Sequence, residues 1–335
     1  MPTQIPFQQL LEALLDSEKP IHPRYLYRLS DLEQSEIDAL ATIWPQLPLS
    51  RRQALMEDIE ELSENDTLLS FEALGCFAIR DEDAKVRLAA VSTLWDYEDR
   101  NLVPIFLDRL SSDSNAEVRA AAAGALGQYV YAGEVDEIPA KLLKTIEEVL
   151  LGVVNSGDVP DVRRASLESL GYSSREEVAP LIEAAYSSKD KEWVASALFA
   201  MGRSANRAWQ PQVMAMLESN LPILRCQAAR AAGELEIEAA LPLLMELLGD
   251  TNDDTRLASI WALSQIGGEG VQEVLEQMYE DAEDDQEIEA LDLALDNLAF
   301  TQGAQLMPLY DFPEDEGDDF DDESFDLLDD EELLD

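Results

Sequence analysis

One short hydrophobic pattern recurs many times between residues 66 and 300. Each copy contains a Val-Arg-like pair, and the second residue of that pair serves below as the marker of a repeat. Apolar or small residues stand one position before the marker and three, four and seven positions after it, as in AEVRAAAAGALG at 116–127. These offsets fall on one face of a helix with 3.6 residues per turn. The pattern therefore predicts a series of amphipathic α-helices.

The markers recur at an almost constant spacing. They are Arg87, Arg119, Arg163, Val194, Arg225, Arg256 and Glu289, and the successive differences in their numbers are 32, 44, 31, 31, 31 and 33. An almost constant period with one insertion is typical of a stacked repeat. The insertion follows Gly127 and contains Tyr129 and Tyr131. Because insertions in solenoids often lie on the binding face, both tyrosines are candidate partner-binding residues.

A second helix is expected in each unit. Four markers are followed eight positions later by a glycine, at Gly127, Gly171, Gly202 and Gly233, and four are followed seventeen positions later by a proline, at Pro104, Pro180, Pro211 and Pro242. Glycine tolerates the left-handed backbone that ends a helix, and proline suits the first turn of the next helix. We therefore expect two antiparallel helices per unit, with the glycine at the turn between them.

The repeat pattern resembles that of a known family. It appears as DAKVRLAAVSTLW, NAEVRAAAAGALG and NDDTRLASIWALS, and in this form it resembles HEAT repeats of the short PBS-lyase HEAT-like type, as found in a family of bacterial HEAT-repeat proteins. The resemblance implies an all-α fold, a right-handed α-solenoid of antiparallel helix pairs. It also implies a structural ladder in which the recurrent arginines bond the turns of neighbouring units: Arg87, Arg119, Arg163, Arg225 and Arg256.

Three regions are expected along the chain. Residues 1–65 carry a helical pattern without the clean repeat and are interpreted as an N-terminal helical cap. Residues 66–300 form the solenoid, with about seven helix pairs. Residues 301–335 form an acidic tail, and 311–335 contain 15 Asp and Glu with no basic residue, a composition that predicts disorder.

The charge of the chain restricts its partners. There are 71 Asp and Glu against 23 Lys and Arg, for a formal net charge of −48. Such a surface repels phosphate backbones and anionic membranes, so we expect no direct nucleic-acid binding and no membrane contact. A protein with a basic surface is the expected partner, and the chain itself is expected to be a monomer. Five apolar side chains in the tail are candidate contacts for that partner: Phe312, Phe320, Phe325, Leu327 and Leu328.

The tail leaves three interpretations open. Acidic segments that carry Phe and Leu suit folding upon binding to a partner. The same segment could act as a solvating tail, or it could dock on its own solenoid, although repulsion between two acidic regions opposes that contact.

Few residues suggest chemistry. His22 is the only histidine, and Cys76 and Cys226 have no metal-ligand spacing, so we expect no catalytic residue, metal or cofactor. Trp193, Trp209 and Trp261 are expected in the core. No segment reads as a signal peptide or a membrane span, which favours a cytoplasmic protein. The prediction is a non-enzymatic scaffold or adaptor; the alternatives are a lyase-like or enzyme-accessory subunit, an anion-binding arginine row, and mimicry of nucleic acid.

Overall fold

The computed structural model describes residues 5–306, which are all helix, turn and loop, with no strand in that range. The α-helices are α1 (Phe7–Leu15), α2 (Gln34–Ile43), α3 (Leu49–Asn65), α4 (Glu72–Ala78), α5 (Ala84–Thr93), α6 (Val103–Ser112), α7 (Ala116–Glu134), α8 (Ala140–Val154), α9 (Pro160–Leu170), α10 (Val178–Tyr186), α11 (Lys191–Arg203), α12 (Gln210–Leu217), α13 (Pro222–Glu234), α14 (Leu241–Leu247), α15 (Asp253–Ile266), α16 (Val271–Asp281) and α17 (Asp285–Leu306). Short 3₁₀ turns lie at Pro23–Tyr25, Tyr27–Leu29, Trp44–Gln46, Arg100–Leu102, Arg207–Trp209 and Glu238–Ala240.

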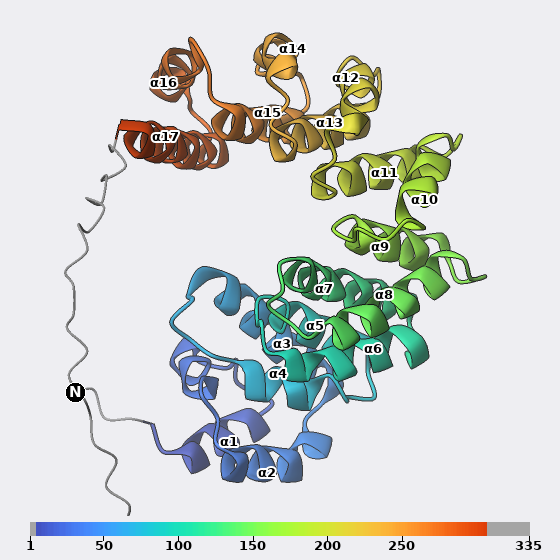
Figure 1. Ribbon diagram of the computed structural model, residues 1–335. Helices are drawn as coiled ribbons and strands as arrows, with labels where there is room; N and C mark the ends of the chain where they lie inside the picture. The colour runs from blue at the N-terminus through green and yellow to red at the C-terminus, as the bar shows by residue number, and fades with distance from the viewer. Residues whose placement is uncertain (1–4, 307–335) are drawn as a thin grey trace, which may run out of the picture.

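The helices form two rows that curve into an open arc (Figure 1). The inner row consists of α5, α7, α9, α11, α13, α15 and α17, and each of these helices packs against the next. The outer row consists of α6, α8, α10, α12, α14 and α16. This is the predicted all-α solenoid of helix pairs. The helix α17 continues through residues 301–306, which the sequence assigned to the tail, so the solenoid extends past the predicted boundary. The rest of the predicted tail, with its candidate residues Phe312, Phe320, Phe325, Leu327 and Leu328, lies outside the described residues.

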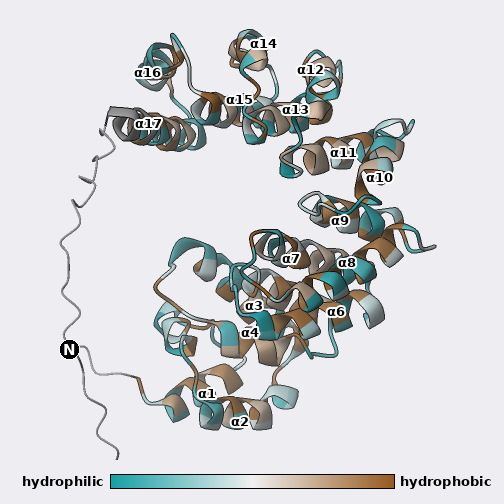
Figure 2. Ribbon diagram, viewed as in Figure 1, coloured by the Kyte–Doolittle hydropathy of each residue, from teal (hydrophilic) through white to brown (hydrophobic). Residues whose placement is uncertain are grey.

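The core lies between the two rows. In α7 the side chains of Val118, Ala122, Ala123 and Leu126 are fully buried, and these are the positions one before and three, four and seven after the marker Arg119. In Figure 2 hydrophobic and hydrophilic residues alternate along the helices, as expected where one face of each helix is buried. The small residues at these positions let the inner helices approach their neighbours closely.

The repeated glycines do not adopt the left-handed backbone that the sequence-based expectation assigned to them. Gly171 is the C-cap residue of α9 and Gly202 and Gly233 lie in the last turns of α11 and α13, whereas Gly127 lies well inside α7, and none of the four has a positive φ. Each faces the next inner helix instead: a Cβ added at Gly171 would lie 2.9 Å from the Cα of Ala200. The left-handed residues that follow α11 and α13 are Ala205, with φ of 50°, and Glu236, with φ of 47°. The presence of glycine at these four positions is therefore explained by the close packing of neighbouring inner helices, and not by a reversal of the chain.

The insertion after Gly127 is helical. It extends α7 to 19 residues and is followed by α8, which has 15 residues. Tyr129 and Tyr131 therefore lie on the last turns of an inner helix instead of in a loop.

The N-terminal region joins the solenoid through α3. This helix, which the sequence assigns to the cap, packs against α5 and so extends the inner row. Arg51 of α3 donates hydrogen bonds to the carbonyl oxygens of Ala13 at 2.9 Å and Asp16 at 2.7 Å, at the C-terminal end of α1. A cation at that end of a helix satisfies free carbonyl groups and opposes the negative end of the helix dipole.

Candidate functional site

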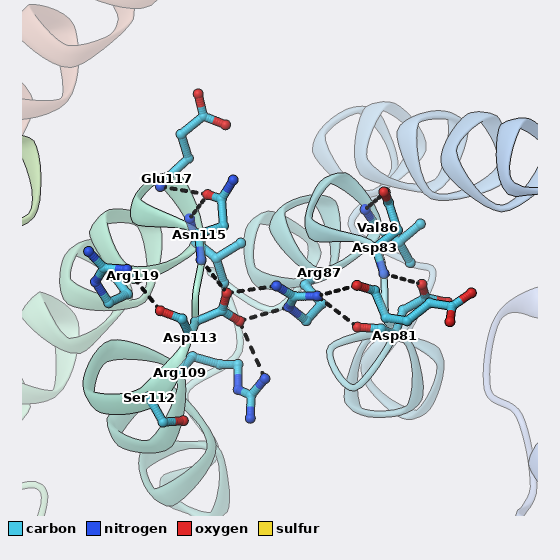
Figure 3. Close-up of polar contacts among 12 residues, drawn as sticks. Asp81, Asp83, Val86, Arg87, Arg109, Ser112, Asp113, Asn115, Glu117 and Arg119 are labelled. Atoms are coloured by element: carbon cyan, nitrogen blue, oxygen red, sulfur yellow. Dashed lines mark hydrogen bonds and ion pairs between the residues drawn. The ribbon is translucent and has the colours of Figure 1, made fainter.

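The marker arginines connect successive units through the turns that precede the inner helices (Figure 3). Arg87 donates two hydrogen bonds to the carboxylate of Asp113, both at 2.7 Å, and a third to the carbonyl oxygen of Asp81 at 2.9 Å. Arg87 is only 7% exposed. Asp113 in turn accepts the N–H of Asn115, whose side chain caps α7. We call each such arginine–aspartate contact a rung of the ladder. A rung links the first turn of an inner helix in one unit to the turn that precedes the inner helix of the next unit.

Two further rungs have the same geometry. Arg119 donates to Asp158 from Nε at 2.9 Å, and Arg225 donates to Asp250 from Nε at 2.6 Å and from Nη2 at 2.8 Å. The hydrogen bond from each arginine lowers the pKa of its aspartate. Burial opposes ionisation of Asp113, but the hydrogen bonds from Arg87 and Asn115 outweigh it and lower the pKa of that carboxyl as well.

Arg256 closes the row with weaker contacts. It donates to the carbonyl oxygen of Asp250 at 3.1 Å and to the carboxylate of Asp253 at 2.8 Å, and its Nε lies 3.5 Å from Glu287. The row also begins earlier than expected, because Arg52 of α3 donates to Asp81 at 2.7 Å.

The ladder is interrupted in the middle of the solenoid. The predicted rung residue Arg163 has no ion pair among the described residues; it donates to the carbonyl oxygen of Val154 at 2.9 Å and lies 5.2 Å from the ring of Trp193. Val194 replaces the next arginine. Ser188 and Ser219 stand where the other units have the accepting aspartate, and each still accepts the backbone N–H two residues on. The hydroxyl preserves the turn but cannot bind a guanidinium as a carboxylate does.

The two candidate tyrosines lie in different environments. Tyr129 is 1% exposed, and its hydroxyl donates to the carbonyl oxygens of Tyr97 and Asp99 at 2.9 and 3.0 Å. It is a core residue that a partner cannot reach, which corrects the prediction for this position. Tyr131 is 50% exposed and packs edge-on against Tyr172, with ring centroids 5.3 Å apart.

A hollow of 350 Å³ lies on the inner helices close to Tyr131. We call it the concave hollow, and its lining is Tyr172, Phe199, Arg203, Arg230, Glu234, Leu257, Ala258 and Trp261. These residues come from α11, α13, α15 and the turn after α9, with none from an outer helix. They occupy mainly the positions five and nine after the marker, which are opposite the buried stripe. The hollow therefore faces the inside of the arc.

Arg203 lies against aromatic rings within the hollow. Its guanidinium carbon is 4.0 Å from the ring centroid of Phe199 and 4.8 Å from that of Tyr172. It also donates to the carbonyl oxygen of Glu168 at 3.3 Å. Stacking of this kind holds an arginine in place while leaving hydrogen-bond donors available.

The hollow also carries charge. Arg230 is exposed at its edge, and among the described residues neither Arg203 nor Arg230 forms a salt bridge. Burial raises the pKa of the Glu234 carboxyl, against the opposing effect of Arg203 and Arg230. Burial likewise raises the pKa of Glu168, while the hydroxyl of Ser196 donates to its carboxylate.

Most of this hollow is absent from the sequence-based predictions. The sequence pattern predicts Trp261 in the core, yet this residue is 39% exposed, and its ring packs over Gly233. Trp209 is buried and Trp193 is half-buried. The sequence does contain a signal for the hollow, because Phe199, Arg230 and Trp261 all stand five positions after their markers, on the helix face opposite the buried stripe. The same position holds Ser92 in α5 and Gly124 in α7.

Within residues 5–306 no group of three or more His, Cys, Asp and Glu is arranged to hold a metal ion. In the same range, none of the helices combines the length and apolarity needed to cross a bilayer. The side chain of His22 accepts a hydrogen bond from the backbone N–H of Arg24 and so caps the 3₁₀ turn at Pro23–Tyr25.

Comparison with known proteins agrees with the repeat. The model for HEAT repeats matches residues 72–145 and 210–295. The chain has no match among curated protein sequences. Similar solved structures include an E. coli protein, YibA, with 18% identity over 84% of this chain and 98% of that one, at a TM-score of 0.42. Human deoxyhypusine hydroxylase has 17% identity over 88% and 96%, with a TM-score of 0.36. Importin beta has 14% identity over 87% and 46%, with a TM-score of 0.39.

The segment between the two matched ranges, residues 146–209, includes α9, α10 and α11, which continue the same two rows. It is also the segment in which the arginine ladder is interrupted. The chain contains HEAT repeats, and they are recognised on both sides of this irregular middle.

Proposed function

We propose that this protein is a non-enzymatic scaffold that binds another protein through the concave hollow. The observation that supports the proposal is a group of aromatic and arginine side chains on the inner row, in which Phe199 and Arg203 are half-buried and Arg230 and Trp261 are exposed. Aromatic residues and arginine are enriched at the energetic centres of protein interfaces. HEAT repeats are themselves common protein-interaction modules, and their stacked helices offer an extended concave surface.

The charge of the chain favours a partner with a basic surface. A formal net charge of −48 creates a negative potential around the molecule. Such a potential raises the rate at which a basic protein arrives and suppresses acidic competitors, whereas the contacts in the hollow set how long the complex lasts.

Affinity capture with the full chain tests this function. Three immobilised baits are compared: the unaltered protein, a hollow variant with Phe199→Ala and Trp261→Ala, and a control variant with Tyr279→Ala. Tyr279 is an exposed aromatic residue on the outer helix α16. We expect a partner that the unaltered and control proteins retain and the hollow variant loses, with recovery that falls as salt rises. Identical recovery by all three baits would contradict a role for the hollow.

A further inference from the structure

Arginine lies on the concave side of three consecutive inner helices. Arg164 of α9, Arg203 of α11 and Arg230 of α13 stand one, nine and five positions after their markers, on the helix face opposite the buried stripe. The corresponding positions on α3 include Glu57 and Glu61. The same face also carries Glu168 and Glu234, which stand five and nine positions after their markers, and Arg164 pairs with Asp161 at 2.7 Å. The middle of the arc therefore gathers arginine and aromatic side chains within a strongly acidic protein, and of the three arginines Arg203 and Arg230 are the two that line the hollow.

The same chain contains a segment with complementary chemistry. Residues 311–335 hold 15 carboxylates and no basic residue, interspersed with Phe and Leu. Carboxylates match guanidinium groups that have free donors, and the apolar side chains match aromatic walls such as Phe199 and Trp261. Arg203 and Arg230 provide such groups, since neither forms a salt bridge among the described residues.

Geometry permits this contact. The described chain ends at Leu306 in α17, an inner helix that packs against α15, which supplies Trp261 to the hollow. Neighbouring helix axes are roughly 10 Å apart, so the path from α17 to α13 is about 20 Å. The 29 residues after Leu306 can span up to about 95 Å when extended. The segment is therefore long enough to reach every residue of the hollow.

We propose that residues 311–335 dock in the concave hollow of their own chain, with carboxylates on Arg203 and Arg230 and Phe or Leu side chains against Phe199 and Trp261. The docked segment masks the surface assigned above to partner binding, so this inference rests on the proposed function for its consequence, though not for the contact itself. A basic partner that binds the carboxylates of the segment would release the hollow. The acidic tail then acts as a competitor that selects for basic partners.

A peptide-binding experiment tests the contact. The probe is a fluorescent synthetic peptide of residues 311–335, and its anisotropy is measured with two full-length proteins. One is the unaltered chain; the other is a tail variant with Phe320→Ala, Phe325→Ala, Leu327→Ala and Leu328→Ala. An intramolecular competitor acts at an effective concentration near millimolar, so the peptide should bind the tail variant at least about tenfold more tightly than the unaltered protein. Equal affinity for the two proteins would overturn the proposal.

Charge reversal locates the site. Arg230→Glu, added to the tail variant, should weaken peptide binding by about tenfold or more, because a hydrogen-bonded ion pair is lost and a repulsive charge is gained. The matched control is Arg207→Glu, which makes the same charge change at an exposed arginine outside the hollow and should alter affinity less than about twofold. Equal effects of the two substitutions would show general charge attraction and would also overturn the proposal.

Crosslinking provides a readout that does not depend on these substitutions. A photoreactive group placed at Phe325 of the full chain should crosslink within the same molecule to α11, α13 or α15. Crosslinks to other helices, or between two molecules, would contradict docking in the hollow. If the peptide fails to bind while the tail variant still captures a partner through Trp261, the docking proposal fails and the proposed function stands.

Discussion

Glycine controls how closely neighbouring inner helices approach. A Cβ added at Gly233 would lie 2.9 Å from the Cα of Ala262, and one added at Gly202 would lie 3.1 Å from the Cα of Ala231. Each of these glycines stands eight positions after its marker and faces the residue six positions after the next marker. The contact is backbone against backbone, so a larger residue could be accepted only if a whole helix moved.

Gly171→Ala should therefore destabilise the protein. The added methyl group would meet the Cα and the carbonyl oxygen of Ala200, both at 2.9 Å, and such overpacking costs about 1 to 3 kcal/mol. The control is Gly152→Ala on α8, where nothing lies within 4 Å and the higher helix propensity of alanine should add up to about 1 kcal/mol. Urea denaturation measures both. Similar effects of the two substitutions would contradict the close-packing explanation.

Residue-scale prediction from the sequence succeeds where the local pattern decides the outcome. The buried stripe follows from the helical period alone, which is why Val118, Ala122 and Leu126 are predicted as core. The same reasoning fails for Tyr129, because its burial depends on a packing cavity and on the carbonyl groups of Tyr97 and Asp99, which lie 32 and 30 positions earlier in the sequence. It fails for Trp261 because assigning a large apolar side chain to the core disregards the helix face on which it stands.

At the scale of elements, the ladder divides the interfaces between units into two kinds: braced interfaces, which have an arginine–aspartate ion pair, and unbraced interfaces, which lack one. Arg87, Arg119 and Arg225 bind the aspartate of the next unit, whereas the units marked by Arg163 and Val194 face Ser188 and Ser219. The regular spacing of the markers predicts which helices stack.

The spacing of the markers cannot predict which rungs form. Each rung needs an acid, and that acid stands 26 positions after Arg87, 39 after Arg119 and 25 after Arg225. The acid belongs to the turn before the next inner helix, five or six positions before the next marker, and the insertion after Gly127 lengthens the separation for Arg119. This turn position can be found once the markers are aligned, but its pairing with the arginine of the preceding unit becomes visible only when the fold brings the two residues together.

A missing rung can be restored and measured. Val194→Arg alone should destabilise the protein by about 2 kcal/mol or more, since it buries a guanidinium that lacks an acidic partner. Ser219→Asp alone should have a small effect because its hydroxyl already serves the turn. Together they should recover about 1 to 3 kcal/mol, which appears as a coupling energy in a double-mutant cycle. Strictly additive effects would show that the two positions do not form a rung.

At the scale of the whole molecule, charge acts against compactness. A formal net charge of −48 on one chain produces self-repulsion that neither the ladder nor the surface ion pairs can neutralise. The prediction of the overall architecture does not depend on this charge, because the fold follows from the repeat and the charge bears on partners and solution behaviour.

Added salt should therefore raise the melting temperature. Between about 10 mM and about 150 mM NaCl the Debye length falls from roughly 30 Å to roughly 8 Å, which is shorter than the distance across the arc. Circular dichroism at a series of salt concentrations measures the shift, and KCl should act like NaCl if screening is the cause. A melting temperature that falls with salt would mean that attractive ion pairs outweigh repulsion.

The unbraced middle of the solenoid and the concave hollow share the same helices. Tyr172 lies beside α9, Phe199 and Arg203 lie on α11, and Trp261 lies on α15, so the hollow bridges the interfaces where aspartate is replaced by serine. These two interfaces lack the arginine–aspartate ion pair that links the other units. We therefore expect a ligand in the hollow, which would contact helices on both sides of them, to restrict the angle between the two halves of the arc.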